Sequence, residues 1–569
     1  MNHYPLTLSH DRGAGQPPLI EETIGAFFDQ IAERHGDREA LVSRHQGLRY
    51  TYAQLRDAAD QLASALLRRG LDKGDRVGIW AHNRAEWVLM QLATARVGLV
   101  LVNINPAYRV AEVGYALNKV QCKALVTMAR FKSSDYLAML RELAPELEMA
   151  SPGHLRAARL PHLRYVAWLD EPGQAGEQPG MERFSDLFAS GLVKDLRLPA
   201  AAAALTAEDP INIQFTSGTT GFPKGATLTH RNILNNGFFV GEAMKLTEAD
   251  RLCVPVPLYH CFGMVLGNLA AFTHGACIVY PAEAFEPGAV LEAVAAERCT
   301  VLHGVPTMFI AVLDHPRFAG FDLSRLRTGI MAGSPCPIEV MRRVIERMHM
   351  AEVTIAYGMT ETSPVSCQSG TDTPLAQRVG SVGRVQPHLE VKIIDPETGA
   401  TVPPGATGEL CTKGYSVMRG YWDDPAKTAE AIEDGWMHTG DLATMDAQGW
   451  VNIVGRSKDM VIRGGENIYP REIEEFLYHH PAVQDVQVVG LPDARLGEEL
   501  CAWIVLKPHQ HADEQAIRDF CKGQIAHYKV PRFIRFVEAF PMTVTGKVQK
   551  FKIREAMMIE LALIEEKTA

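Results

Sequence analysis

A hydroxyl-rich and glycine-rich segment of the sequence has the composition of an anion-binding loop. Residues 213–226 read IQFTSGTTGFPKGA and contain, as candidate phosphate contacts, Thr216, Ser217, Gly218, Thr219, Thr220, Gly221 and Lys224. Hydroxyls, exposed backbone N–H groups and a lysine together suit the outer phosphates of ATP. A Walker A loop starting at Gly218 would need a glycine where the sequence has Pro223, so that motif is excluded. A flexible turn has the same composition, and this segment alone does not decide between the two.

Four further blocks with chemically active residues follow in order along the chain. They are YGMTET at 357–362, WMHTGDL at 436–442, GRSKDMVIRGGENIYP at 455–470 and PMTVTGK at 541–547. With the first segment, they resemble in kind and order the blocks of the adenylate-forming superfamily of acyl-CoA synthetases, luciferases and peptide-synthetase adenylation domains. The resemblance spans about residues 20 to 560 and is closest to medium-chain fatty acyl-CoA ligases, through PLYHCFG, AGSPCP and GKVQKFKIRE.

The resemblance implies a nucleotide site assembled from several blocks. Asp441 would accept hydrogen bonds from both ribose hydroxyls, as a carboxylate with two acceptor oxygens can, and Arg456 would reach the same ribose. The remaining AMP contacts would be Gly333, Ser334, Pro335, Ala356, Tyr357, Gly358, Met359, Thr360 and Ile453. Tyr357 would stack on the adenine. Without the family pattern, a turn aspartate, a salt-bridged arginine and a packed tyrosine would account for the same residues.

Adenylation brings two anions together, because a carboxylate must attack the α-phosphate of ATP. Positive charge is needed to offset that repulsion in the transition state. The resemblance implies Glu361 as a Mg²⁺ ligand, Thr360 at the α-phosphate and Lys547 as a bridge between carboxylate and phosphate oxygens. Magnesium combines few protein carboxylates with phosphate oxygens, which suits a single glutamate. Without the blocks, Glu361 and Lys547 would be interpreted as solvated surface charges.

A second half reaction requires a thiol, here that of CoA, to attack the acyl adenylate. Lys547 and the incoming thiol cannot share one site, so the resemblance implies a C-terminal domain that moves. It places the hinge at Lys458. It places the CoA channel at Gly464, Gly465 and Glu466.

The segment 257–263 bears on the class of acid. His260 within it resembles a residue near the acyl carboxylate and the thiol entry, and a buried structural histidine is an equally good interpretation. No carboxylate is present there to pair with an ammonium group, whose unpaired burial is costly, so free amino acids are disfavoured. Gly358 is expected to leave open the space that a tryptophan fills in acetate-specific relatives. Apolar candidates for the acyl pocket, or else plain core, are Phe238, Phe239, Val305, Met308 and Met331.

These residues together predict an AMP-forming ligase that joins a fatty acid, most readily of medium chain length, to CoA. Its co-substrates would be ATP and CoA, and its cofactor Mg²⁺. Open alternatives are a ligase for branched-chain or aryl acids, an enzyme that loads an acyl-carrier protein, and a nucleotide-binding regulator without catalysis. Intact Glu361, Asp441 and Lys547 speak against the regulator.

Strand and helix patterns predict the elements that must position these residues. Over the first 330 residues, helical stripes alternate with apolar strands, as in 51–70, 76–82, 97–102 and 124–127. Such alternation implies parallel sheets in two subdomains, and short strands at about 379–457 imply a smaller β-barrel-like subdomain. We expect an α/β fold with a large domain over 1–457 and a small mobile α+β domain over 458–569. The alanine-rich residues 199–206 are predicted to be a linker.

Composition narrows the partners and the compartment. The 569 residues carry 57 Lys and Arg against 67 Asp and Glu, and the resulting charge of −10 disfavours nucleic acid. The ten cysteines are scattered without zinc-knuckle spacing, which fits a reducing compartment. No signal peptide or membrane-spanning tract is recognised. We expect a cytoplasmic enzyme of small-molecule substrates, with a homo-oligomer left open.

Overall fold

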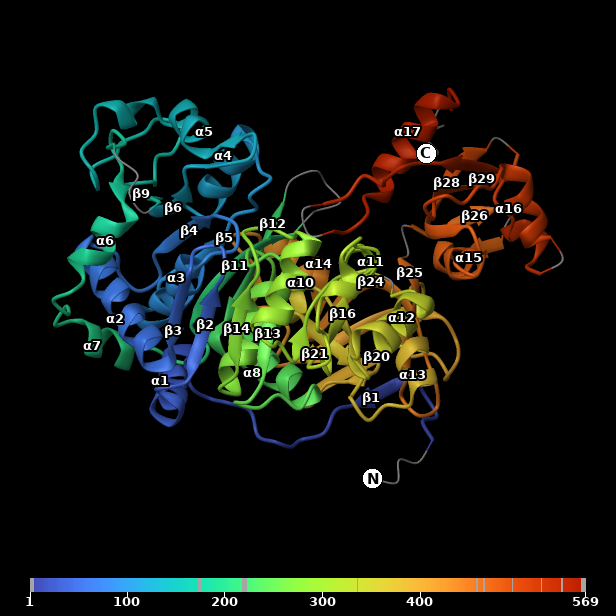
Figure 1. The fold of residues 1–569 in the computed structure, drawn as a ribbon, viewed down its shortest axis with the longest axis horizontal. Helices are drawn as coiled ribbons and strands as arrows, with labels where there is room; N and C mark the ends of the chain where they lie inside the picture. The colour runs from blue at the N-terminus through green and yellow to red at the C-terminus, as the bar shows by residue number, and fades with distance from the viewer. Residues whose placement is uncertain are drawn as a thin grey trace.

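The computed structural model describes residues 5–171, 176–216, 223–334, 336–456, 459–463, 466–493, 495–522, 524–543 and 546–563. Within these segments the strands form sheets of eight, nine, six and five strands and one short hairpin. In Figure 1 the red C-terminal part of the chain forms a module set apart from the larger remainder. The predicted α/β class, with a large and a small part, is confirmed.

The eight-stranded sheet contains the strands predicted from the first apolar runs. It is parallel from β10 to β11 and antiparallel beyond. Its order is β10 (Glu182–Arg183), β9 (Tyr165–Leu169), β6 (Ala124–Met128), β4 (Arg76–Trp80), β5 (Val100–Asn103), β11 (Pro210–Thr216), β12 (Lys224–Thr229) and β22 (Gly420–Tyr421). Strands β5, β6 and β9 are buried throughout, as expected when helices cover both faces of a parallel sheet.

The nine-stranded sheet is parallel from β2 to β17 and antiparallel at its two edges. Its order is β19 (Arg384–Val385), β18 (Val365–Gln368), β17 (Glu352–Gly358), β16 (Thr328–Ala332), β15 (Val301–Leu302), β13 (Arg251–Cys253), β14 (Cys277–Tyr280), β2 (Glu39–Ser43) and β3 (Leu48–Thr51). One continuous apolar cluster joins the two large sheets, and it includes Tyr52, Trp80, Ile213 and Tyr280. The two sheets therefore share one hydrophobic core.

Helices connect the strands of these two sheets. Those of the first half are α1 (Ile24–His35), α2 (Tyr52–Arg68), α3 (Ala85–Val97), α4 (Val110–Lys119), α5 (Tyr136–Leu143), α6 (Phe184–Ser190) and α7 (Leu198–Ala203). Those of the second are α8 (His230–Ala243), the π-helix η2 (Phe262–Leu269), α9 (Ala270–Thr273), α10 (Pro287–Ala296), α11 (Pro306–Leu313), α12 (Ile338–Met348) and α13 (Leu375–Gly380).

The six-stranded sheet is antiparallel and corresponds to the predicted β-rich subdomain. It contains β1 (His10–Arg12), β20 (Leu389–Ile394), β21 (Gly408–Gly414), β24 (Trp436–Met445), β23 (Ile432–Glu433) and β25 (Val451–Arg456), with α14 (Pro425–Ala431) nearby. Strand β1 comes from the N-terminus and pairs with β20. That pairing was not predicted, because it joins segments that lie far apart in the sequence.

The C-terminal module has an apolar core of its own, which includes Val461, Leu477, Val488 and Ile534. Its sheet contains β27 (Glu466–Ile468), β26 (Val461–Arg463), β29 (Gly497–Leu506), β28 (Val483–Asp493) and β30 (Phe533–Phe536). Helices α15 (Pro470–Leu477), α16 (Glu514–Cys521) and α17 (Lys550–Glu560) belong to the same module.

Local sequence signals are borne out at several places and fail at one. The helix predicted at 51–70 is α2, and a capping box begins it, where the Thr51 side chain accepts from the backbone N–H of Gln54. The linker predicted at 199–206 is wrong, because α7 occupies Leu198–Ala203 and alanine is the strongest helix former. All ten cysteines are buried and unpaired. Among the described residues, no helix combines the length and the apolar character needed to cross a membrane.

Candidate active site

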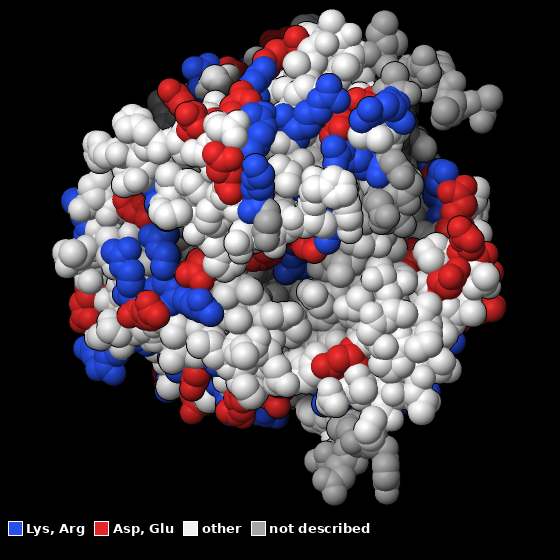
Figure 2. Space-filling view, turned by 90° about the vertical axis from the view of Figure 1, so that its right-hand side faces the viewer, with Lys and Arg blue, Asp and Glu red and all other residues white. Residues whose placement is uncertain are grey.

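The candidate residues gather where the parallel strands of both large sheets end. Thr216 is the last residue of β11, Gly333 follows β16, and Gly358 ends β17. Ligands of open α/β sheets bind at the carboxyl ends of the strands, so this edge is the expected place for chemistry. Figure 2 shows a hollow there, between the C-terminal module above and the larger part below, with acidic and basic side chains inside it.

Glu361 is held by two hydroxyl groups from different parts of the chain. It lies in the short helix η4 (Thr360–Thr362) and is only 5% exposed. The Thr216 hydroxyl donates to its Oε1 atom at 2.9 Å, and the Tyr421 hydroxyl donates to the same oxygen at 2.9 Å. The Lys224 ammonium lies 4.3 Å from the centre of the Tyr421 ring, a cation–π contact. The structure thus brings Thr216, Lys224 and Glu361 together around a tyrosine.

Tyr421 was missed by the sequence reasoning. It lies in the two-residue strand β22, which pairs with β12 so that Ala226 is opposite Tyr421. Burial and the neighbouring Glu361 carboxylate raise the pKa of its hydroxyl, which stays protonated and can donate. No chemical motif surrounds it in the sequence, and only the pairing of distant strands reveals its position.

Asp441 is tied to the tyrosine expected at the adenine. The Tyr357 hydroxyl donates to Asp441 Oδ2 at 2.7 Å, and burial raises the pKa of Tyr357 well above its usual value. Asp441 lies in β24 opposite Arg456 of β25, while Ile453 lies opposite Ala443 two residues further along. The backbone of Gly333 has φ +91°, which glycine adopts without strain. The residues expected to contact adenine and ribose therefore lie on strands that are held together.

Lys547 enters this region from the C-terminal module. A Cβ atom at Gly333 would lie 3.6 Å from Lys547 Cε, which places the lysine side chain beside the end of β16. The Thr307 hydroxyl donates to the carbonyl of Gly546 at 3.3 Å, and a Cβ at Gly546 would lie 2.9 Å from Val305 Cγ2. The module thus meets the larger part at the start of helix α11.

Further contacts join the module to the larger part of the chain. The Gln484 amide donates to Asp314 Oδ2 at 3.3 Å, and the Arg471 guanidinium donates to the carbonyl of Ile453 at 2.5 Å. Each of these is a single hydrogen bond rather than an apolar contact. They hold the module in the arrangement that brings Lys547 to the strand ends.

The surroundings of His260 favour its neutral form. Burial, reinforced by the charge of Lys547, lowers the pKa of His260 to about 3. Its Nδ1 atom accepts from the backbone N–H of Phe262 at 3.1 Å, so the ring proton belongs on Nε2. Burial also raises the pKa of Cys261 to about 11, which leaves it a thiol. His260 is therefore suited to donate a hydrogen bond in the pocket.

The acyl-pocket candidates do not all lie together. Val305 and Met308 are buried in one cluster, near Gly546, and Met331 belongs to a second. Phe238 packs on His274 and Phe239, in a third group that includes Tyr415. Phe238 and Phe239 are thus placed apart from Val305 and Met308.

Gly358 is exposed, as expected of a residue beside open space, but its backbone leaves no room for a side chain. A Cβ atom at this position would lie 1.8 Å from the carbonyl oxygen of Pro364, which belongs to the segment before β18. A larger side chain would displace that backbone. The glycine therefore serves close packing of two strands, and its absence of side chain does not by itself enlarge the pocket.

Part of the predicted site lies outside the described residues. This holds for the phosphate-contact candidates Ser217, Gly218, Thr219, Thr220 and Gly221, and for Pro335, Lys458, Gly464 and Gly465. The side chains of Arg456 and Glu466 are likewise not described. Of the described candidates, Ser334 follows Gly333 after β16, Ala356 lies in β17, Met359 precedes η4, and the Thr360 hydroxyl lies 3.8 Å from Cys261 Sγ.

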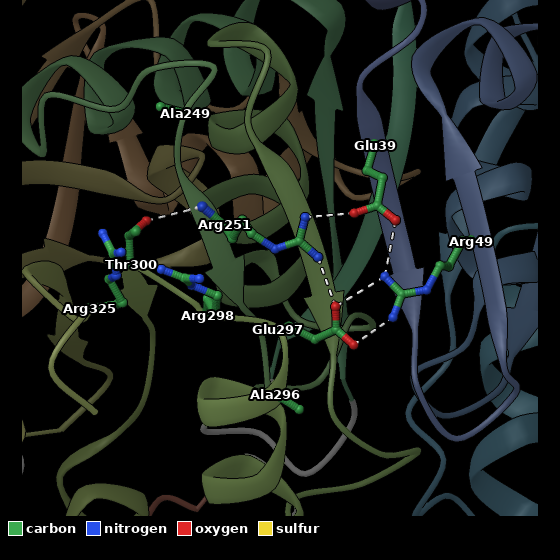
Figure 3. Close-up of a pocket in the computed structure, with 9 residues that line it drawn as sticks. All are labelled: Glu39, Arg49, Ala249, Arg251, Ala296, Glu297, Arg298, Thr300 and Arg325. Carbon is green, nitrogen blue, oxygen red and sulfur yellow. Dashed lines mark hydrogen bonds and ion pairs between the residues drawn. The ribbon is translucent and has the colours of Figure 1, made fainter. Parts of the chain in front are cut away.

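A pocket of about 380 Å³ lies at the opposite edge of the nine-stranded sheet, near the starts of β2 and β13 (Figure 3). Arg49 and Arg251 there share Glu39 and Glu297, with N–O distances of 2.7 to 3.0 Å. This ion-pair network joins the starts of β2 and β13 to β3 and to Glu297, which follows α10. It lies away from the residues predicted to bind nucleotide, and we assign it a structural role.

Comparison with known proteins agrees with this arrangement. The family described as AMP-binding enzyme matches residues 28–422, and that described as AMP-binding enzyme C-terminal domain matches residues 472–547. The chain is 48% identical over 552 residues to the mitochondrial medium-chain acyl-CoA ligase ACSF2 of Bos taurus. The aligned region covers 96% of this chain and 89% of that protein.

Solved structures of other enzymes have a similar fold over nearly the whole length of this chain. The anthranilate CoA ligase AuaEII in complex with anthranoyl-AMP matches with a TM-score of 0.84 at 27% identity, covering 96% of this chain and 99% of that chain. The fatty acyl CoA synthetase of Mycobacterium tuberculosis matches with a TM-score of 0.71 at 26% identity, covering 95% and 99%.

Proposed function

Because this chain belongs to the AMP-binding enzyme family, we propose that it is an AMP-forming acyl-CoA ligase whose preferred acid is a medium-chain fatty acid. In the first step the carboxylate attacks the α-phosphate of ATP, which gives an acyl adenylate and pyrophosphate. In the second step the CoA thiol attacks the acyl carbonyl, and AMP leaves. The observation that carries the proposal is the meeting of Glu361, Thr216, Asp441 and Lys547 at one edge of the two sheets.

Each of these residues has a role that its contacts support. The Lys547 ammonium would lie between the carboxylate and phosphate oxygens, where it offsets their repulsion as the bond forms. Asp441 would hold the ribose hydroxyls, and the Tyr357 hydroxyl that donates to its Oδ2 fixes the orientation of the carboxylate. His260 would donate its Nε2 hydrogen toward the acyl carboxylate, because its other nitrogen is already bound.

The residues present fit one magnesium ion. Both hydroxyl donors bind Oε1 of Glu361, and within the described segments Oε2 accepts no hydrogen bond. Glu361 Oε2 would therefore hold the ion together with ATP phosphate oxygens. Bound Mg²⁺ would supply positive charge to the phosphates during adenylation.

Thioester formation requires the C-terminal module to leave. We propose that the chain divides into residues 1–457 and 458–569, with Lys458 as the hinge and residues 464–466 in the CoA channel. Lys547 contributes to the first step only, because the thiol must approach the acyl carbonyl through the space that the module now fills. The single hydrogen bonds across this junction support such a movement.

The acid is assigned from the relatives and from the apolar wall at Val305 and Met308. Burying one methylene gains about 0.8 kcal/mol, so a fitting tunnel would favour each added carbon by about fourfold until it is full. Aryl acids are the second candidate, because the AuaEII structure contains anthranoyl-AMP. The buried unpaired cysteines support a reducing compartment, and we propose the cytoplasm.

A panel of straight-chain acids from C2 to C16, with benzoate and anthranilate beside them, tests the assignment. Pyrophosphate release and acyl-CoA formation are measured at saturating ATP and CoA. We expect kcat/KM to peak at medium chain length. A maximum at an aryl acid would replace the proposed substrate class. Turnover with a holo carrier protein but not with CoA would replace the acceptor.

A further inference from the structure

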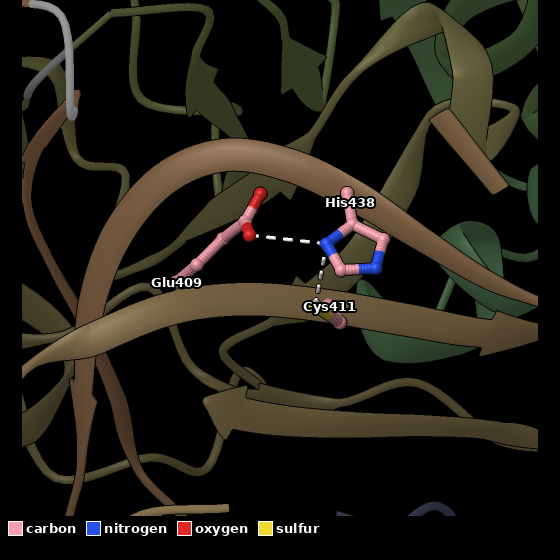
Figure 4. A group of neighbouring side chains, drawn as sticks. All are labelled: Glu409, Cys411 and His438. Atoms are coloured by element: carbon pink, nitrogen blue, oxygen red, sulfur yellow. Dashed lines mark hydrogen bonds and ion pairs between the residues drawn. The ribbon is translucent and has the colours of Figure 1, made fainter. Parts of the chain in front are cut away.

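Three side chains with different metal-binding atoms converge on one face of the six-stranded sheet, as Figure 4 shows. Glu409 and Cys411 lie two residues apart in β21, so their side chains point to the same side of the strand. His438 in β24 is the direct cross-strand partner of Cys411. Two paired strands thus present a carboxylate, a thiol and an imidazole as a group, without any loop.

The distances within this group are close to those of a tetrahedral metal site. His438 Nδ1 lies 3.0 Å from Glu409 Oε2 and 3.7 Å from Cys411 Sγ, and all the donor atoms lie within 4.8 Å of one another. Zinc bonds of about 2.0–2.3 Å at tetrahedral angles place neighbouring donor atoms about 3.3–3.6 Å apart. The two distances that involve His438 are thus close to these values, and the Glu409 and Cys411 side chains, within 4.8 Å of each other, would move toward a shared ion.

The outer contacts of the group also match those of a metal site. Glu433 Oε2 lies 3.7 Å from the second ring nitrogen of His438, longer than a hydrogen bond but near the place where metal-bound histidines usually meet a carboxylate. The other oxygen of Glu409, Oε1, accepts from the backbone N–H of Gly440 at 2.9 Å, while Oε2 contacts His438 Nδ1 at 3.0 Å, a contact that a bound ion would replace. The side chains of His438 and Glu409 are 26% and 18% exposed, so an ion can enter from solvent.

We propose that Glu409, Cys411 and His438 bind one zinc ion per chain, with the fourth coordination position open to water. A thiolate, an imidazole and a carboxylate together are a donor set that zinc accepts. The Cys411 thiol releases its proton when the ion binds, and His438 binds as neutral imidazole. This site is distinct from the magnesium position at Glu361, and it precedes Asp441 by three residues along β24.

Metal titration of the full-length protein tests the site without any assay of activity. Chelator-treated protein in metal-free buffer is titrated with Zn²⁺ by calorimetry. We expect one ion per chain, loss of this binding in Cys411→Ser, and binding weakened about tenfold or more in Glu409→Gln. Glu433→Gln, which changes only the outer contact, should weaken binding by about 10–100-fold. Cys521→Ser is the matched control, because Cys521 is a buried cysteine of the C-terminal module, and it should bind as the parent does.

Cobalt provides a second measurement that identifies the ligand. Co²⁺ bound to the parent and to Cys521→Ser should give a thiolate-to-metal absorption band in the near ultraviolet, which Cys411→Ser should lack. Should Cys411→Ser fail to fold, the two conservative glutamine variants still decide. The proposal is overturned if the parent binds no stoichiometric zinc, or if Glu409→Gln and Glu433→Gln bind it as tightly as the parent.

Discussion

The contact between Gly546 and helix α11 gives a way to separate the two half reactions. Gly546 has φ +79° and directly precedes Lys547. A methyl group at this position would lie 2.9 Å from Val305 Cγ2 and 3.2 Å from Thr307 Oγ1. Gly546→Ala should therefore push the module away from the arrangement that places Lys547 at the strand ends.

Gly546→Ala has two energetic effects, backbone strain and steric overlap with Val305, and only the second should change the adenylation rate. Left-handed backbone costs an alanine about 1–2 kcal/mol, but the turn around Gly546 is closed by its own hydrogen bonds, such as that from Thr543 N to Lys547 O at 2.7 Å. The backbone strain of the alanine is therefore the same whether or not the module is docked on the larger part of the chain. The overlap with Val305 exists only in the docked position and costs about 1–2 kcal/mol. Adenylation should therefore slow by about 5- to 30-fold.

The assay measures each half reaction separately. Acid-dependent exchange of pyrophosphate into ATP reports adenylation, and CoA ester formation from synthetic acyl adenylate reports thioester synthesis. We expect the first to fall and the second to stay within about twofold of the parent. Gly399→Ala is the control for backbone strain alone, because Gly399 has φ +70° and no atom within 4 Å of the added Cβ.

A second substitution tests whether the contact with Val305 causes the loss. Val305→Ala removes the atom that the new methyl group would meet, so the double variant should recover part of the lost adenylation rate. Because Val305 is also proposed for the acyl wall, the double variant is compared with the Val305→Ala single variant. Equal loss of both half reactions in Gly546→Ala would show a general defect. No recovery in the double variant would show that the contact with Val305 is not the cause.

Lys547→Ala should slow adenylation by about 10²–10³ and leave thioester synthesis from acyl adenylate within a few-fold, and an unchanged exchange rate would remove Lys547 from the mechanism. Tyr357→Phe removes the hydroxyl that holds Asp441, so the KM for ATP should rise about tenfold while the KM for the acid stays constant, and an unaltered KM for ATP would contradict this. Tyr421→Phe keeps its ring against the lysine but removes one hydrogen bond to the magnesium-binding carboxylate, so adenylation should fall about tenfold, whereas equal rates would argue against that role. Burial keeps the pKa of His260 near 3, below its usual 6.5, so its contribution to stability is present above about pH 6.5 and is lost as the pH falls toward 3. The thermal unfolding midpoint of His260→Asn should accordingly fall less between pH 7 and 5 than that of the parent, and parallel curves would refute the assignment.

Short-range patterns in the sequence predicted most of the local structure. The helix expected at 51–70 is α2, and the strands expected at 76–82 and 124–127 are β4 and β6. The strand expected at 97–102 begins only at Val100, because α3 continues to Val97 and Gly98 ends it in a left-handed conformation. Periodicity and capping residues act within a few positions, which explains their reliability here.

Contacts between distant segments could not be predicted from the same patterns. Tyr357 and Asp441 were each proposed for the nucleotide site, but their hydrogen bond depends on how two sheets meet. Tyr421 was missed altogether for this reason. Gly358 was predicted to leave space open because acetate-specific relatives have a tryptophan at that position. The carbonyl of Pro364 lies next to it because of how two strands pair, which local sequence patterns do not show.

The weak junction between module and sheets has a consequence for energy use. Each of its hydrogen bonds, such as those from Thr307 and Gln484, contributes about 0.5–1.5 kcal/mol, so separation needs only ordinary thermal motion. The proposed movement between the half reactions would then need no chemical step of its own. Bound ligands would then set which of the two proposed orientations is populated.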